Sequence, residues 1–348
     1  KGVPRAVQNI LIVRLDHIGD LICSLPVLPV LKRRFPSAEI TVLTGEEGKA
    51  ILAGNPFVAH LVTFSPNWFS RKRFVNPIQF FRIIYGLRKT KYDLGFDLRG
   101  DLRNIVLMIL AGVRYRIGYG IGGGGSLLQK RYEYDPTLHQ VELNQKLVAE
   151  EVVPKSNLKP EIYVMREEKE TALKKLRAHG VPEKTQLIAI HPEAGYPSKE
   201  WEAQNFRTLI EKILMDSQNT VLVFGLSKAR QVADFFSGSG RVINLVGQFS
   251  LREMIAALSC CDLFIGNDSG PSHIAQALGI PMVILASGTN EYEKWGVWSK
   301  SSTVLKYSVP CSPCQLEYCN VEGHPCMSQI SPDQVWQAAC SLSALSRP

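Results

Sequence analysis

Seven residues at positions 267–273, Asn-Asp-Ser-Gly-Pro-Ser-His, combine side chains suited to binding an anion. They follow an apolar segment that we predict to be a buried strand, and Pro271 suits the first turn of a helix predicted over Pro271–Leu278. A helix that starts after a parallel strand presents free N–H groups and the positive end of its dipole. Gly270 leaves room for a ligand beside the backbone, and His273 can donate to a phosphate oxygen. The run predicts a phosphate-binding helix terminus.

The same run allows a simpler interpretation, because Asp268 or Ser269 can cap the helix without any ligand. A second loop bears on this choice: residues 191–201 read HPEAGYPSKEW and also follow a predicted strand. Lys199, which comes after Ser198, would supply mobile positive charge to a diphosphate if it faced the helix terminus. The alternative is a surface lysine beside a packed tryptophan.

A third motif, Asp16-His17-Ile18-Gly19-Asp20, comes directly after the first predicted strand. Gly19 permits a tight turn there, and Asp20 stands at the start of the next predicted helix. Asp20 is therefore either a helix cap or a general base at the rim of a ligand cleft.

The glycine-rich stretch Gly118–Gly125 contains a GxGxxG pattern, but we do not interpret it as a dinucleotide site. It does not close a strand–turn–helix unit, and no acidic residue follows at about 20 positions. We expect a flexible loop.

Four cysteines crowd into the last fifth of the chain, at Cys311, Cys314, Cys319 and Cys326, with His324 between the last two. Such a set can bind zinc or an iron–sulfur cluster. The spacing matches no standard finger or ferredoxin pattern, so a packed loop without metal is the other interpretation.

Short apolar runs alternate with amphipathic stretches along the chain, which is the order expected of an α/β protein with parallel sheets covered on both faces. The first series of predicted strands and helices comprises Asn9–Leu15, a helix ending near Phe35 that Pro29 should distort, Glu39–Thr44, Leu61–Phe64, Pro77–Lys89, Asp93–Asp97 and Leu102–Ala111. The second comprises Leu187–His191, Asn205–Met215, Thr220–Phe224, Ala229–Phe236, Val242–Leu245, Leu251–Leu258, Asp262–Gly266, Pro271–Leu278 and Met282–Leu285.

This pattern predicts two Rossmann-like domains, at 1–157 and 158–331, joined by the proline-containing linker Val153–Glu161. A last helix begins at Pro332, capped by Ser331. Ligands of open α/β sheets bind beyond the carboxyl ends of the strands. With two such sheets facing each other, we expect the site in the cleft between them.

Composition narrows the class of protein. The 348 residues are 45% hydrophobic and 21% charged, which excludes a disordered or collagen-like chain. No apolar run approaches the ~20 residues of a transmembrane helix. No signal-peptide pattern is visible, so we expect a reduced cytoplasmic setting.

The net charge of +8 is uneven, because residues 1–160 hold +10 and residues 161–348 hold −2. The basic half predicts an acidic substrate or an anionic membrane surface, unless it is an ordinary solvated surface. No nucleic-acid-binding signature accompanies it.

Several motifs, in order along the chain, resemble glycosyltransferase family 9, the ADP-heptose:lipopolysaccharide heptosyltransferases and their relatives. They are the HIGD loop, HPEAG…SKEW, NLVGQFSLREMIAAL (Asn244–Leu258) and FIGNDSGPSHIAQALGIPMVIL (Phe264–Leu285), with weaker echoes in DLRGDLRN (Asp97–Asn104), RIGY (Arg116–Tyr119), HQVELN (His139–Asn144) and the cysteine-rich segment. The Asp-Ser-Gly-Pro-Ser-His block is the most specific of them.

The resemblance implies a GT-B fold whose C-terminal helix, 332–348, crosses back onto the first domain. It also implies inverting transfer of a sugar from a nucleotide-diphosphate donor, ADP-heptose in this family, without a metal or other cofactor. Asp20 would be the general base, and Asp268 would lie near the sugar. The diphosphate would be held by Ser198, Lys199, Ser269, Gly270 and His273. Residues 245–247, including Gly247, would flank the nucleobase together with Leu251.

One departure concerns the ribose. Relatives that use ADP-heptose carry a Glu just after the strand equivalent to Thr220–Phe224, whereas this chain has no carboxylate around Ser227. The expected partners are a nucleotide-sugar donor and an anionic glycolipid acceptor of the lipopolysaccharide type. We expect the enzyme in the cytoplasm or peripherally on the inner face of the cytoplasmic membrane. The alternatives are a GT-B enzyme with another nucleotide sugar, a non-catalytic sugar-nucleotide or glycan-binding protein, and a redox protein built on the cysteines.

Overall fold

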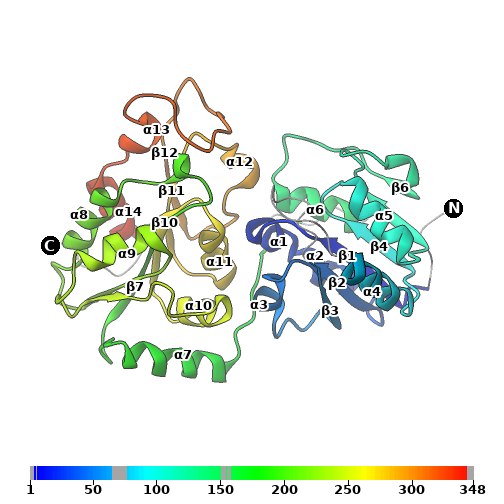
Figure 1. Ribbon diagram of the computed structural model, residues 1–348, viewed down its shortest axis with the longest axis horizontal. Helices are drawn as coiled ribbons and strands as arrows, with labels where there is room; N and C mark the ends of the chain where they lie inside the picture. Colours follow the sequence, from blue (N-terminus) through cyan, green and yellow to red (C-terminus); the bar gives the residue numbers. More distant parts are fainter. Residues whose placement is uncertain (1–3, 5, 65–76, 150–153, 155–157, 343–348) are drawn as a thin grey trace. The chain divides into compact units, whose positions relative to one another are not determined.

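The computed structural model describes residues 4, 6–64, 77–149, 154 and 158–342, and the chain divides into two compact units (Figure 1). Unit 1 comprises Lys1–Tyr163 and unit 2 comprises Val164–Pro348. The predicted linker 153–161 lies partly outside the described residues, and the boundary falls at Tyr163. No described helix is both long and apolar enough to cross a membrane.

The sheet of unit 1 has six parallel strands in the order β3-β2-β1-β4-β5-β6. Their bounds are β1 Asn9–Arg14, β2 Glu39–Thr44, β3 His60–Thr63, β4 Leu94–Asp97, β5 Tyr115–Gly118 and β6 Lys130–Arg131. The apolar patterns predicted β1 to β4 within one or two residues. The short strands β5 and β6 were not predicted, because four and two residues carry little periodicity.

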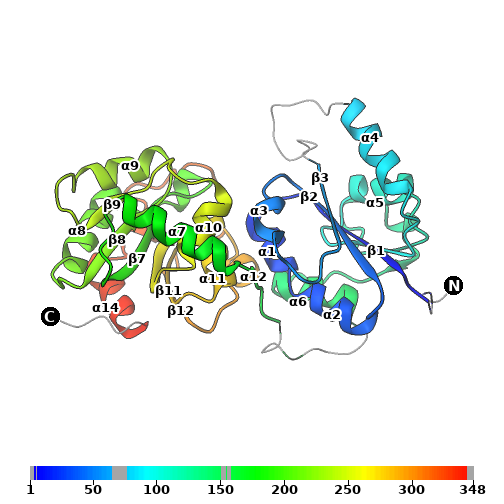
Figure 2. The same ribbon diagram turned by 90° about the horizontal axis from the view of Figure 1, so that it is seen from below.

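Helices cover this sheet on both faces (Figure 2). They are α1 Ile18–Ser24, α2 Val27–Arg34, α3 Gly48–Leu52, α4 Pro77–Arg88, α5 Leu102–Leu110 and α6 Gln140–Val148. α4 and α5 share one buried cluster with Leu11 and Val13 of β1. The expected distortion of this helix is present: α1 ends at Ser24 and α2 begins at Val27, so Pro29 lies in the first turn of α2, where the missing N–H is not needed.

Unit 2 repeats this architecture with a second parallel sheet, in the order β12-β11-β10-β7-β8-β9. Its strands are β7 Gln186–His191, β8 Asn219–Val223, β9 Val242–Asn244, β10 Leu263–Asn267, β11 Met282–Ala286 and β12 Ser302–Lys306. Its helices are α7 Arg166–Ala178, α8 Ala203–Ile213, α9 Ser227–Asp234, α10 Leu251–Leu258, α11 Gly270–Leu278, α12 Tyr292–Trp295, α13 Pro325–Ser328 and α14 Pro332–Leu342.

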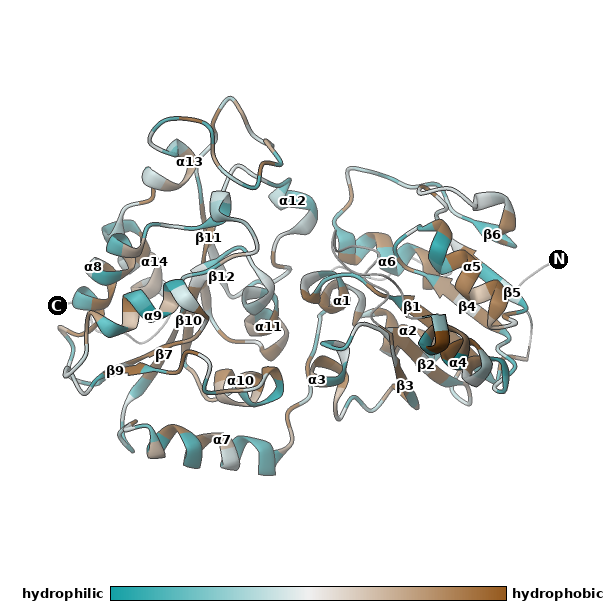
Figure 3. Cartoon of the chain, in the orientation of Figure 1, coloured by the Kyte–Doolittle hydropathy of each residue, from teal (hydrophilic) through white to brown (hydrophobic). Residues whose placement is uncertain are grey.

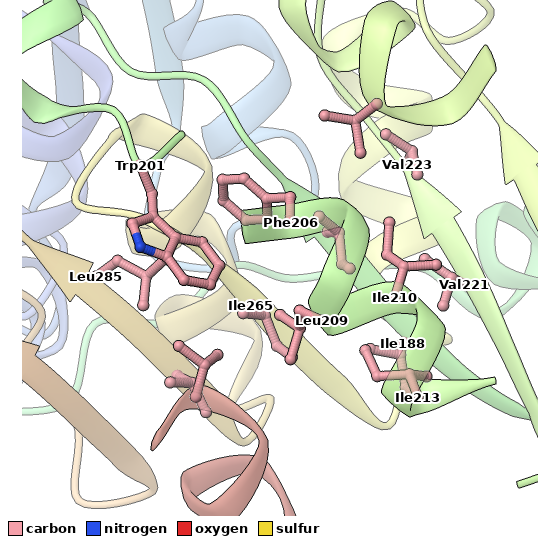
Figure 4. Close-up of a cluster of buried hydrophobic side chains, with 14 of the residues drawn as sticks. Ile188, Trp201, Phe206, Leu209, Ile210, Ile213, Val221, Val223, Ile265 and Leu285 are labelled. Carbon is pink, nitrogen blue, oxygen red and sulfur yellow. The ribbon is translucent and has the colours of Figure 1, made fainter. Parts of the chain in front are cut away.

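The core of unit 2 centres on fully buried aromatic and aliphatic side chains from α8, β7, β8 and β10, with Trp201 at one side (Figure 4). The last helix belongs to this core, since Val335 and Ala339 of α14 are buried in it. The apolar side of α14 packs on α8, β11 and β12, and the expectation that helix 332–348 crosses back onto the first domain stays a prediction. Residues 343–348 lie outside the described residues.

In both units the first strand lies next to the fourth, so both have the doubly wound strand order. Loops leaving two such neighbouring strands diverge to opposite faces, and ligands bind in the crevice that results. In unit 1 these are the loops after β1 and β4. In unit 2 they are the loops after β7 and β10, which carry the predicted lysine and phosphate motifs.

Candidate functional site

The start of α11 collects buried polar atoms that have no hydrogen-bond partner. Asp268 and His273 are each 6% exposed. Among the described residues, Asp268 Oδ1, Ser269 Oγ and His273 Nδ1 are buried without a partner. Unpaired buried polar groups are costly, about 1–3 kcal/mol each, and most buried polar groups of native proteins have a partner. Together with the N-terminus of α11, these atoms point to a ligand that supplies the missing hydrogen bonds.

The ionisable side chains at this site are Lys199, Asp268 and His273. Burial lowers the pKa of His273, with Asp268 opposing and Lys199 adding to that shift. The Nζ atom of Lys199 lies 3.3 Å from Asp268 Oδ2, and the two side chains are only 13% and 9% exposed. Lys199 therefore faces the helix terminus. A phosphate bound there could replace Asp268 as the partner of Lys199.

The loop that carries Lys199 is fixed from one side by the core. Trp201 is fully buried, and its indole Nε1 donates to the carbonyl of Ile330 at 2.9 Å. Asn267, at the end of β10, accepts from the backbone N–H of Trp201 at 3.1 Å and donates to the carbonyl of Pro192 at 2.9 Å. One amide side chain thus ties both ends of the loop to the strand that leads into the phosphate motif.

The cysteine-rich segment fixes the same loop from the other side. Ser198 is buried, and its hydroxyl donates to the carbonyl of Leu316 at 2.5 Å. His324 donates from Nε2 to the carbonyl of Ser198 at 2.9 Å, and Thr289 Oγ1 lies 3.2 Å from Ser198 Oγ. These contacts fix the loop that carries Lys199, and the expectation that Ser198 also holds the diphosphate stays a prediction.

The cysteines of that segment are unpaired thiols of differing exposure. Burial raises the pKa of Cys326, whereas Cys311 is exposed. Within the described residues, no group of three or more His, Cys, Asp or Glu side chains is arranged to hold a metal ion. What the described contacts do show is a segment packed against the Lys199 loop.

Two further predicted residues lie at the same sheet edge. Gly247 follows β9 with a φ of 70°, in a turn that favours glycine. Leu251 is the first residue of α10, a helix capped by Ser250, whose hydroxyl accepts from the Glu253 N–H. α10 packs on α11. Ser250 and Glu253 form a reciprocal capping box that fixes the start of α10.

Glu193 is a residue that the sequence analysis quoted without assigning a role. Its carboxylate accepts from the backbone N–H groups of Leu226, Lys228 and Ala229, at 2.5, 2.7 and 3.2 Å. A carboxylate therefore does stand beside Ser227, although it comes from the loop after β7. Only the fold brings these segments together, and no local sequence signal could have indicated it.

In unit 1, Asp20 lies in the first turn of α1 and is held by a buried arginine. The Arg14 side chain is 1% exposed, and its Nη2 donates to Asp20 Oδ1 at 3.0 Å. Arg14 Nε lies 2.8 Å from Asp16 Oδ1, and Nη1 donates to the carbonyl of Leu98. Burial opposes the charge of Arg14, but Asp16 and Asp20 raise its pKa, so the guanidinium stays charged.

The loop after β4 completes this cluster. Arg99 donates to Asp16 Oδ2 at 2.8 Å. Asp97 is fully buried and accepts from the backbone of Arg99 and Asp101 and from the amide of Asn104. Burial raises the pKa of Asp97 to about 6. The sequence analysis selected Asp20 but missed Arg14, whose position inside a strand gave no hint that it turns toward the loops.

Comparison with known proteins places these observations in a family. The family model described as Glycosyltransferase family 9 (heptosyltransferase) matches residues 80–324, well over half of the chain. A lipopolysaccharide heptosyltransferase 3 from Escherichia coli is 28% identical over 298 residues, which cover 81% of this chain and 84% of that enzyme. A lipooligosaccharide heptosyltransferase 2 from Campylobacter jejuni is 27% identical over 165 residues. The latter match covers 45% of this chain and about half of that relative, 51%.

The fold agrees with solved structures of the same kind. The E. coli ADP-heptose lipopolysaccharide heptosyltransferase II superimposes with a TM-score of 0.78 at 21% identity, over 96% of this chain and 98% of that one. The predicted α/β class and GT-B fold are thereby confirmed.

Proposed function

Because the chain belongs to glycosyltransferase family 9, we propose that it is an inverting glycosyltransferase that moves heptose from ADP-heptose to an anionic lipopolysaccharide-type saccharide. The observation that carries the donor half of this proposal is the set of unpaired buried atoms on Asp268, Ser269 and His273 at the start of α11. A nucleotide diphosphate provides acceptor oxygens for Ser269 Oγ, His273 and the helix N–H groups, and a hydroxyl of the sugar can donate to Asp268 Oδ1.

In the proposed mechanism, unit 2 binds the donor. The N–H groups at Gly270 and the side chains of Lys199 and His273 hold the diphosphate and stabilise the charge that develops on it as the sugar leaves. Asp268 lies beside the sugar, and Gly247 and Leu251 flank the nucleobase. No step requires a metal ion, because Lys199 and the helix terminus supply the positive charge.

Unit 1 supplies the base. Asp20 takes the proton of the acceptor hydroxyl as that oxygen attacks the anomeric carbon, so the sugar is transferred with inversion in one displacement. Arg14 holds Oδ1 of Asp20 and leaves the other carboxylate oxygen to accept the proton. The acceptor is a glycolipid, so we further propose that the protein works in the cytoplasm in peripheral contact with the anionic membrane surface.

The test measures release of ADP from ADP-heptose in the presence of a heptose-deficient lipopolysaccharide acceptor. Asp20→Asn should lower turnover by roughly 10²–10⁴-fold, the usual contribution of a positioned general base, with little change in donor affinity. Asp135→Asn, in the half-buried loop before α6, is the matched control. Near-normal turnover of the Asp20 variant would remove Asp20 from the mechanism. Absence of transfer from ADP-heptose by the wild type would refute the proposed donor.

A further inference from the structure

The outward side of α5 is apolar, which is unusual for a helix at a protein surface. Its inward residues are buried, including Ile105, Leu107 and Met108. Four outward residues are also aliphatic and each is 36–40% exposed: Leu102, Val106, Ile109 and Leu110. The one charged outward residue of α5 is Arg103, which pairs with Asp101. Figure 3 shows α5 coloured as hydrophobic along much of its length. A helix that is apolar all round is normally buried against a partner.

The neighbouring helix α4 extends this surface. Ile84 and Leu87 of α4 lie in the same buried cluster as Ile105 and Met108, so the two helices pack side by side (Figure 2). On its outward side, α4 exposes Phe81 and Tyr85, at 68% and 66%. We call the six outward residues the α4–α5 face: Phe81, Tyr85, Leu102, Val106, Ile109 and Leu110.

Basic residues border this face without opposing carboxylates. Residues 77–92 contain four basic residues, all exposed, and no acidic residue: Arg82, Arg88, Lys89 and Lys91. The next carboxylates are already engaged, because Asp93 accepts from the backbone N–H groups of Gln8 and Asn9 and Asp101 pairs with Arg103. The occupant of the α4–α5 face therefore offers both apolar area and negative charge.

We propose that the α4–α5 face docks on an anionic lipid bilayer, with Phe81 and Tyr85 at the boundary between headgroups and acyl chains. Aromatic and aliphatic residues on one side of a helix, flanked by Arg and Lys, are the chemistry of interfacial membrane binding. A second copy of this chain suits the face less well, because pairing it with itself opposes like charges. This inference rests on the proposed function in one respect, the peripheral contact with the membrane, and it assigns that contact to the α4–α5 face.

The experiment measures sedimentation of the full chain with lipid vesicles, without donor or acceptor. We expect binding to phosphatidylcholine vesicles that contain phosphatidylglycerol, and little binding to phosphatidylcholine alone. Phe81→Ser with Tyr85→Ser should weaken binding at least about tenfold. Arg82→Gln with Arg88→Gln should weaken it about 25-fold, since each basic residue near an anionic leaflet contributes about fivefold.

Matched controls come from unit 2, where Met215 is 72% exposed and Lys169 and Lys174 lie exposed on α7. Met215→Ser and the Lys169→Gln, Lys174→Gln pair should leave vesicle binding unchanged. Wild-type protein that ignores anionic vesicles, or face variants that bind like the controls, would overturn the proposal. So would ultracentrifugation that shows a dimer lost in the face variants, since a second copy would then cover the face. None of these results depends on sugar transfer, so failure of the membrane proposal would not contradict the proposed glycosyltransferase activity, which is tested separately.

Discussion

Replacing His273 by alanine tests whether the unpaired atoms at α11 bind phosphate. Burial lowers the pKa of this histidine, so the ring is largely neutral near pH 7. A neutral donor that bonds a charged oxygen contributes about 1.5–3 kcal/mol. Since 1.4 kcal/mol corresponds to a factor of ten, His273→Ala should weaken ADP binding about 10- to 150-fold. Adenosine lacks the phosphates, and its affinity should hardly change.

The structure also predicts what the variant does to the free protein. Because Nδ1 of His273 has no partner in the ligand-free protein, the wild type already bears the cost of burying an unpaired polar group. Alanine removes that cost, which offsets the loss of packing, and the melting temperature should stay close to that of the wild type. Weaker ADP binding at nearly constant stability separates a ligand-binding residue from a structural one.

Titration calorimetry with ADP and with adenosine measures these affinities, and His60→Ala in unit 1, a 57% exposed side chain, is the control. Lys199→Ala should follow the same pattern, with a loss in the same range. Equal losses for ADP and adenosine would show that neither side chain reads phosphate. A variant that binds ADP normally but melts far below the wild type would show that His273 only supports the fold.

The remaining predictions concern pH, the cysteine-rich segment and salt. Burial raises the pKa of Asp97 from 3.8 to about 6, so the folded state binds this proton more tightly than the unfolded state. The free energy of unfolding should therefore decrease as the pH rises through about 6, by at most about 3 kcal/mol. The melting temperature of the wild type should therefore fall relative to Asp97→Asn between about pH 4 and about pH 7; a constant difference would contradict this. His324→Ala removes one hydrogen bond to the Lys199 loop and should weaken ADP binding about 2- to 10-fold, with no effect on adenosine binding. Treating the wild-type protein with a chelator should leave its ADP binding unchanged. Stoichiometric zinc or iron by elemental analysis, with loss of structure on chelation, would reverse our interpretation of the cysteines. Added salt should raise the KM for acceptor steeply and that for donor only slightly, and replacing Arg71, Lys72 and Arg73, which lie outside the described residues, should act likewise at low salt; equal salt dependence for both substrates would mean that the basic half is only a solvated surface.

The long apolar segments were predictable because burial on both faces of a parallel sheet leaves a plain sequence pattern. β1, β2, β7 and β11 were predicted within one residue at either end, and so was α10. The strand end and helix start at the proposed phosphate motif were also predictable, because they depend on local chemistry within seven residues. β12 was missed, and each of its residues is only partly buried.

Residues whose role depends on distant contacts were not predictable. Glu193 reaches the start of α9 only because β7 and β8 are neighbours in the sheet. His324 and Ser198 are 126 positions apart in sequence. The hydroxyl of Ser198 donates to the carbonyl of Leu316 in the cysteine-rich segment, a contact that its place beside Lys199 did not indicate. A sequence pattern indicates which residue types are available, whereas packing decides which atoms remain free to bind.

The proposed base in unit 1 and the proposed phosphate site in unit 2 lie at equivalent edges of their sheets, but their polar atoms differ in whether they already have partners. In unit 1, Asp20 is already held by Arg14, so its orientation does not depend on a ligand. In unit 2, among the described residues, Asp268 Oδ1, Ser269 Oγ and His273 Nδ1 lack partners, and Lys199 is paired with Asp268. If unit 2 binds the donor as proposed, these atoms gain their missing interactions when the donor binds. Variants in unit 2 should then act mainly on donor affinity, and variants at Asp20 or Arg14 mainly on turnover, because each perturbs the step in which its interactions change.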